Sequence, residues 1–291
     1  MSPSSSRFSF SNPTVARLWA VVVVLVVALL GLGVGIGLVF GLSVVALLAG
    51  VRPTPAVALV ISLVSIQGVA FGGLALVYLK LRGRSVVSLG VHLPDLRESL
   101  FVLGGYVTAF LAAAVGAVAV TLTNAPTGEN QVAELANADP SVLLWLIPAS
   151  VLLIGPGEEL LFRGIVQGRL RETFSPVWGV VLASALFASV HFVALTGGVG
   201  GRLVTILVLF LPSLVFGSVY ELTDNLVVPA LVHGLYNATL FALAYAAFKL
   251  SRSGATSPGG GAGTGTATAA TLAGASAAWH HALSVAAALP F

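Results

Sequence analysis

An uncharged, mostly apolar run of 34 residues, from Leu18 to Val51, is the feature that most constrains how this chain can fold. A helix of about 20 apolar residues already crosses the roughly 30 Å hydrocarbon core of a bilayer. The apolar core of a cleaved signal peptide has only about 7 to 15 residues. We therefore expect a retained membrane span that tilts, kinks or protrudes because it is over-long, with a split into two short helices as the alternative.

The composition extends this expectation to the whole chain. Of its 291 residues, 57% are hydrophobic and only 8% are charged, whereas soluble domains carry about 25% charged residues. The apolar runs are too long for barrel strands, and only helices or closed barrels satisfy their backbone in lipid. The fold class predicted is all-α, a polytopic transmembrane helical bundle.

The same composition removes several kinds of chemistry. There is no cysteine, which excludes disulfides, thiolate catalysis and zinc–thiolate sites. The 13 basic side chains are scattered and form no block, so nucleic acid is not an expected partner. The lipid bilayer is an expected partner.

Seven spans are predicted, and the chain divides into three parts. The spans cover about 18–50, 56–80, 99–123, 141–168, 177–195, 203–222 and 226–248. The parts are an N-terminal segment (1–17), a helical membrane domain (18–250) and a tail (251–291). The tail begins with a Gly/Ala/Thr/Ser-rich linker and ends in an apolar stretch too short to span alone, so an eighth span would need the tail.

Basic residues favour one orientation. With the N-terminus inside, eight Lys and Arg residues fall on the cytoplasmic side and four on the other, as the positive-inside rule requires. The loop from Asn124 to Pro140 holds acidic residues and no basic one, which fits an exterior loop. We expect a multi-pass protein of the cell membrane with a cytoplasmic N-terminus.

Ionisable side chains inside three of the spans mark the candidate site. A charged residue near the bilayer centre costs about 2.5 to 3.5 kcal/mol on insertion scales. The fourth span nevertheless contains Glu158, Glu159 and Arg163, the fifth contains His191, and the seventh contains His233 with Asn237. Each histidine alone is equally well explained by packing, and an amide such as Asn237 alone more often joins two helices. Their occurrence together favours a functional site.

Spacing suggests separate roles for the two glutamates. Glu159 and Arg163 are at i and i+4, on one helical face, and can pair. Glu158 lies about 100° round the helix, without that partner, and can meet neighbouring helices. His233 and Asn237 are also at i and i+4.

The polar groups fall at comparable depths. Glu158 lies 14 residues before Glu172 and His191 lies 15 residues after Pro176, so both are roughly 21–22 Å from the turn between their helices. Gly155-Pro156-Gly157, just before the glutamates, should loosen or kink the fourth span.

These groups are suited to amide hydrolysis. Glu158, buried without a cation, could act with His191 to hold and deprotonate a water, while His233 and Asn237 could stabilise an oxyanion. No nucleophile-elbow motif supports a serine enzyme, and no H-E-x-x-H helix supports a zincin. Zinc held by Glu158, His191 and His233 stays open, as do a non-catalytic scaffold or regulator of the same fold and a proton or solute carrier.

Three motifs carry a resemblance to a known family. The segment 157–164, GEELLFRG, resembles the E-E-x-x-x-R motif of the CAAX-prenyl-protease and bacteriocin-processing (CPBP) intramembrane endopeptidases. Phe187 to His191 resembles that family's F-x-x-x-H motif, and residues 217–237 its third region, which ends in H-x-x-x-N. The match covers about 148–245, in order and on separate helices.

This resemblance implies a metal-independent glutamate-type protease without a cofactor. It implies that Glu158 and His191 activate water, that His233 and Asn237 form the oxyanion hole, and that Glu159 and Arg163 support them. The partner would be a membrane-associated peptide or protein. The family name does not identify that substrate, because cleavage of prenylated proteins characterises its eukaryotic members.

Overall fold

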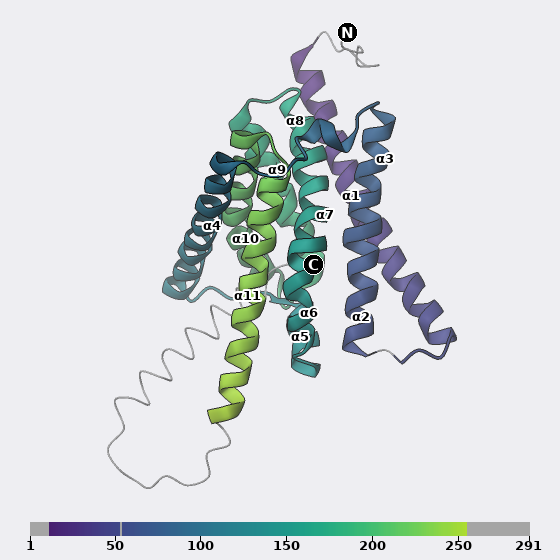
Figure 1. Cartoon of the computed structure of the whole chain (residues 1–291), viewed down its shortest axis with the longest axis vertical. Coiled ribbons are helices and arrows are strands. Elements are labelled where there is room, and N and C mark those ends of the chain that lie inside the picture. Colours follow the sequence, from purple (N-terminus) through teal and green to yellow (C-terminus); the bar gives the residue numbers. More distant parts are fainter. Residues whose placement is uncertain (1–11, 53, 255–291) are drawn as a thin grey trace.

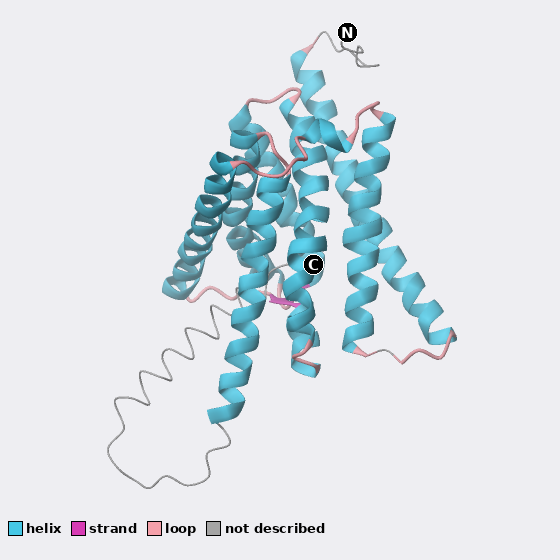
Figure 2. Cartoon of the chain, in the orientation of Figure 1, coloured by secondary structure: helices cyan, strands magenta, loops and turns pink. Residues whose placement is uncertain are grey.

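In the part of the chain that the structure describes, seven long apolar helices form a bundle (Figure 1). The computed structural model describes residues 12–52 and 54–254. The seven candidate spans are Pro13–Leu48, Pro55–Leu81, Leu96–Thr123, Val142–Arg171, Pro176–Ala194, Val199–Thr223 and Val227–Leu250. The predicted all-α polytopic bundle is confirmed, and the chain is an integral, multi-pass membrane protein. The described part of the chain contains hardly any sheet (Figure 2).

Four spans consist largely of one helix each. These are α1 (Pro13–Leu48), α4 (Leu96–Thr123), α10 (Val199–Thr223) and α11 (Val227–Gly254). The Asn12 side chain caps the start of α1 by accepting from the Thr14 amide, with Pro13 in the first turn, and Asp95 and Glu98 form a capping box at the start of α4. α1 is one continuous helix, so the alternative of two short helices is wrong. Its 36 residues measure about 54 Å, and it crosses the bundle obliquely (Figure 1).

The second, fourth and fifth spans are interrupted by wider or tighter turns. The second consists of α2 (Pro55–Ser62), the π-helical η1 (Leu63–Gly73) and α3 (Leu74–Leu81). The fourth consists of α6 (Val142–Ala149), η3 (Ser150–Ile154), α7 (Gly155–Glu159), η4 (Leu160–Gln167) and α8 (Gly168–Arg171), and the fifth of α9 (Pro176–Val190) and the 3-10 turn η5 (His191–Ala194). In the fourth span η3 and η4 are π-helical and flank the Gly-Pro-Gly segment, as expected where prolines remove backbone donors.

Short elements cover the ends of the bundle. η2 (Val86–Leu89) lies between the second and third spans. The predicted exterior loop contains β1 (Glu129–Asn130) and α5 (Gln131–Ala138), and β1 pairs antiparallel with β2 (Leu195–Thr196). The tail prediction is only partly covered: α11 continues to Gly254, and residues 255–291, with most of the linker and any eighth span, lie outside the described residues.

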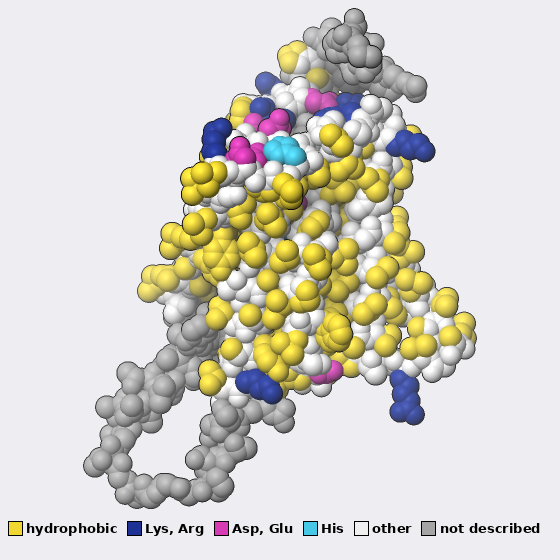
Figure 3. All heavy atoms as spheres, in the orientation of Figure 1, with side chains coloured by type: hydrophobic (Ala, Val, Ile, Leu, Met, Phe, Trp, Pro, Cys, Tyr) yellow, Lys and Arg dark blue, Asp and Glu magenta, His cyan; other side chains and the backbone are white. Residues whose placement is uncertain are grey.

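Charged side chains gather at the two ends, with a hydrophobic band between them (Figure 3). We call the end where α1 begins the proximal end and the opposite end the distal end. At the proximal end, Glu172 accepts from Arg82 and Arg169, and Glu221 pairs with Arg171. The pair between Arg171 and Glu221 joins α8 to α10. Large apolar side chains such as Phe40 and Leu29 are exposed along α1, as a lipid-facing helix requires.

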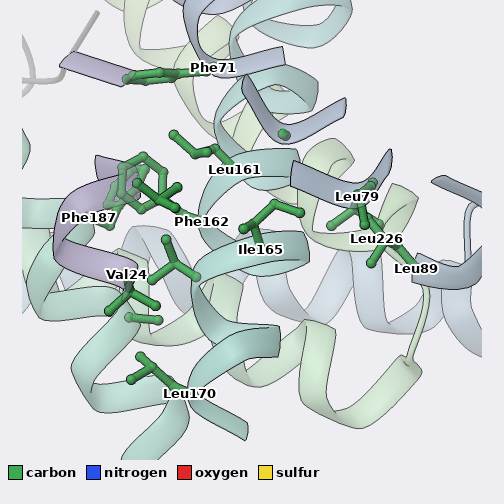
Figure 4. Packing of buried hydrophobic residues seen from close by; sticks show 14 of the residues in the cluster. Val24, Phe71, Leu79, Leu89, Leu161, Phe162, Ile165, Leu170, Phe187 and Leu226 are labelled. Atoms are coloured by element: carbon green, nitrogen blue, oxygen red, sulfur yellow. The ribbon is translucent and has the colours of Figure 1, made fainter. Parts of the chain in front are cut away.

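A hydrophobic cluster joins the fourth span to its neighbours. Leu161, Phe162 and Ile165 pack against side chains from the first, second and fifth spans (Figure 4). The Phe162 ring makes T-shaped, edge-to-face contacts with Phe71 and Phe187, with centroids 5.8 and 5.0 Å apart. The η4 part of the fourth span is thus enclosed by other helices.

Candidate active site

Glycines bring the helices of the site into backbone contact. A Cβ at Gly155 would lie 2.6 Å from the Ala230 carbonyl oxygen, and one at Gly234 would lie 2.8 Å from the Ser150 oxygen. On the other side of α7, a Cβ at Gly157 would lie 2.7 Å from the Gln67 carbonyl oxygen. The fourth span therefore touches α11 and η1 where the acidic residues begin, in the manner of small-residue contacts between membrane helices.

The predicted pair between Glu159 and Arg163 is present and fully buried. Arg163 Nε donates to Glu159 Oε2 at 2.8 Å, and both side chains have no exposed surface. The guanidinium also donates to the hydroxyl oxygens of Ser184 and Ser213, at 3.4 and 2.9 Å. These extra hydrogen bonds satisfy donors that a buried arginine could not leave unpaired.

Glu159 also contacts the seventh span, which spacing did not predict. Its Oε1 lies 2.9 Å from His233 Nδ1, while the Phe216 ring stacks on the imidazole with centroids 4.6 Å apart. Asn237 Nδ2 lies 3.1 Å from His233 Nε2. Glu159 therefore orients His233 in addition to pairing with Arg163.

Glu158 meets the second span. Gln67 Nε2 donates to Glu158 Oε1 at 2.7 Å, and both side chains are buried. The other oxygen, Oε2, has no hydrogen-bond partner among the described residues and lies 3.8 Å from His233 Nε2. Glu158 thus has one fixed oxygen and one oxygen turned toward the histidine.

Charge balance links Glu158 to His233. With both glutamates ionised, Arg163 neutralises only one of the two negative charges, and a net buried charge is costly. One further proton, on Glu158 or on His233, makes the cluster neutral. When His233 is neutral, its Nδ1–H donates to the Glu159 carboxylate, and its Nε2 can only accept, here from Asn237.

His191 lies apart from this network. Its Nδ1 is 2.6 Å from the Phe187 carbonyl oxygen; a carbonyl only accepts, so Nδ1 carries the hydrogen and the neutral ring offers Nε2 as an acceptor. No direct hydrogen bond joins His191 to Glu158 among the described residues. The Phe187 ring contacts both imidazoles, with centroids 4.7 Å from His191 and 5.7 Å from His233.

A cavity of about 320 Å³ borders His191. Its walls come from α1, from the second span, from α5 and from η5, so it lies in the distal half of the bundle. The described residues that line it are mainly apolar and include no Asp, Glu, Lys or Arg; among them are Leu32, Ile36, Leu59, Ile66 and Leu135.

The described residues include no group of three or more His, Asp or Glu side chains placed to hold a metal ion. The set that the zinc alternative requires, Glu158, His191 and His233, is not such a group.

Sequence reasoning missed three residues of the site. Gln67 is the lone amide of its span, and that was the signal that could have identified it. Ser184 and Ser213, which bind Arg163, carry no comparable signal, because serine is common in membrane helices and bonds its own backbone.

Fold and site together define a polytopic helical membrane protein whose spans enclose a buried carboxylate–histidine–amide cluster. The family model "Type II CAAX prenyl endopeptidase Rce1-like" matches residues 140–239. This segment contains α7, α9 and α11 up to Asn237, and so most of the cluster. The match confirms, for this segment, the resemblance that the three motifs predicted.

The chain is also similar to a curated bacterial protein, whose name assigns no activity. The chain is 36% identical over 87 residues to the uncharacterized protein YpbD of Bacillus subtilis (strain 168). The alignment covers 30% of this chain and 39% of that protein, so the chain spans well under half the length of the relative it matches. No solved structure gives a significant match.

Proposed function

We propose that this protein is an intramembrane endopeptidase that uses a glutamate-activated water and no metal. The observation that carries the proposal is the state of Glu158. Its carboxylate is buried among helices. Among the residues that the structure describes, it forms no ion pair with Arg or Lys, and its oxygen nearer His233 has no hydrogen-bond partner. The match of residues 140–239 to an endopeptidase family supports the same reaction class.

Glu158 serves as the general base. A base must lie within hydrogen-bond reach of the proton that it takes, and Oε2 is the oxygen left for a water. His191 offers Nε2 as an acceptor from the neighbouring helix, next to the apolar cavity. In the proposed reaction His191 holds the water, and Glu158 removes its proton.

The position of the cluster's extra proton couples the base to the oxyanion site. When that proton is on His233, Glu158 is ionised and can act as base. In the same state His233 gains an Nε2–H donor, and Asn237 can turn its amide so that Nδ2 is free. The protonation state that prepares the base is therefore the one that supplies donors for an oxyanion.

The chemistry balances without a further reactant. The water oxygen forms a bond to the carbonyl carbon of the substrate peptide bond while Glu158 takes the proton. His233 and Asn237 donate to the resulting oxyanion. The C–N bond then breaks, the carbonyl re-forms, and the proton moves from Glu158 to the leaving nitrogen.

The cavity supports a membrane-associated peptide or protein as the substrate. Because the described residues of its walls include no Asp, Glu, Lys or Arg, the cavity suits an uncharged, apolar stretch of chain that reaches His191 from the distal half of the bundle. We keep the predicted cytoplasmic N-terminus as part of the proposal, which makes the distal side the non-cytoplasmic one.

Glu158→Gln is the test. Gln keeps the shape but cannot take the proton, so cleavage should fall by about 10²- to 10⁴-fold, the usual contribution of a general base. Membrane peptides from cells with wild-type and variant protein are compared by mass spectrometry, and peptides with new termini should appear only with the wild type. The matched control is Glu172→Gln, which alters a partly exposed ion pair at the proximal end.

The same comparison separates the rival classes. A scaffold or regulator would keep its phenotype in Glu158→Gln, provided that the thermal stability of the purified variant matches the wild type. Identical peptide profiles from the two strains would reject the protease. A carrier would instead lose proton or solute flux while the peptide profiles stay the same.

A further inference from the structure

The second span contributes a side chain to the cluster from outside the segment that matches the endopeptidase family. Gln67 lies in η1, far from residues 140–239 in sequence. Its Nε2 donates to Glu158 Oε1 at 2.7 Å, and both residues are about 1% exposed. A contact this short inside the bundle is shielded from water, which strengthens it.

Two local features build this contact. η1 is π-helical from Leu63 to Gly73, a widened turn that often occurs at functional sites. Opposite it, Gly157 lets the backbones meet, because a Cβ there would lie 2.7 Å from the Gln67 carbonyl oxygen. The backbone of Gln67 thus abuts Gly157 while its side chain reaches the adjacent Glu158.

The contact has an electronic and a geometric effect on Glu158. An N–H that donates to a carboxylate forms a charge-assisted hydrogen bond, roughly twice as strong as a neutral one, and so favours the ionised form. It also engages Oε1 and restrains the carboxylate, which leaves Oε2 as the oxygen 3.8 Å from His233 Nε2.

We infer that Gln67 is a positioning residue that holds Glu158 ionised and oriented for proton transfer. The inference rests on the proposed function of Glu158 as base. The plain alternative is that Gln67 only joins two helices, as buried amides in membrane proteins do. That alternative predicts a loss of stability and no change in the protonation of Glu158.

Gln67→Met tests the inference, since Met is unbranched, has a similar length and lacks the donor. Infrared spectra of purified protein in lipid, recorded at one neutral pH, report the C=O stretch of the protonated acid. The band of Glu158 is assigned by its absence in Glu158→Gln. The ratio of neutral to ionised Glu158 should rise about tenfold or more in Gln67→Met, the effect of losing one hydrogen bond to a charged group.

Ser65→Ala is the matched control, because Ser65 is buried on the same π-helical segment and its hydroxyl has no partner among the described residues. Its spectrum should equal that of the wild type. If Gln67→Met lowers the melting temperature, Gln67→Asn replaces it, since it keeps an amide one methylene short of Glu158. An unchanged Glu158 band in the folded Gln67 variant overturns the inference.

The infrared result does not depend on proteolysis, so it stands even if the proposed function fails. Where cleavage is measured, Gln67→Met should lower kcat about tenfold and leave KM nearly unchanged, because Gln67 acts through Glu158. A change confined to KM would also contradict a positioning role.

Discussion

Glu159 Oε1 lies 2.9 Å from His233 Nδ1, so a residue that the spacing assigned to Arg163 also orients the histidine of another helix. With its other oxygen on Arg163, Glu159 connects the guanidinium to the imidazole. Because a carboxylate only accepts, this contact determines that Nδ1 carries a hydrogen and that Nε2 is the nitrogen that faces Glu158 and Asn237.

Glu159→Gln should destabilise the protein strongly. It removes the carboxylate that pairs with Arg163 and so leaves a buried charge without its counter-ion, at a cost of about 3–5 kcal/mol. Thermal unfolding in detergent and the yield of folded protein measure the effect. The control Glu172→Gln, at a partly exposed pair, should cost about 1 kcal/mol or less; equal losses in the two variants would contradict the central role of Glu159.

Gly234→Ala should disturb both stability and the site. The new Cβ would lie 2.8 Å from the Ser150 oxygen and 2.8 Å from the Val151 Cα, and backbone cannot turn aside. Forcing the fourth and seventh spans apart should cost about 1–3 kcal/mol and move His233 away from Glu158. Gly33→Ala, where a Cβ meets nothing within 4 Å, is the control and should melt like the wild type.

Ile36→Trp should obstruct the cavity without harming the fold. Ile36 lies on α1 and lines the cavity beside His191, so a larger side chain should exclude the substrate and raise KM by about tenfold or more, a loss of some 1.4 kcal/mol. Leu29→Trp on the same helix replaces an exposed side chain and should change neither KM nor the melting temperature. Normal KM in Ile36→Trp would show that the substrate approaches by another route.

Chelators should leave the proposed activity intact. Among the described residues no three His, Asp or Glu side chains are grouped as metal ligands, and the proposed reaction needs only Glu158 and its neighbours. Cleavage is measured before and after dialysis against a strong zinc chelator. Activity that disappears and returns with added zinc would replace the glutamate mechanism with the zinc alternative.

Much of the fold could be read from the chain because hydrophobicity and helical spacing are local properties. A long apolar run such as 18–51 favours a lipid environment whatever the rest of the chain does. The pair Glu159–Arg163 forms within one helix, because the two residues are at i and i+4. His233 and Asn237 likewise share one helical face because of their spacing, and Asn237 Nδ2 lies 3.1 Å from His233 Nε2.

Contacts between helices could not be predicted in this way. Gln67 and Glu158 are 91 residues apart, and Glu159 and His233 are 74 apart. Which side chains of two helices meet depends on the depth and rotation at which the helices cross. The close backbone contacts at Gly155, Gly157 and Gly234 set this depth and rotation. His191 is a further example, since among the described residues its ring hydrogen-bonds the Phe187 carbonyl oxygen and not Glu158.

The sequence by itself determined that this protein is a bundle of membrane helices with costly polar groups on three of them, because burial in lipid acts on each segment independently. Only the tertiary structure decided which oxygen of each glutamate is occupied, which nitrogen of His233 carries the hydrogen, and that the second span takes part. Those features depend on distances of a few ångströms between helices, and helix packing sets them.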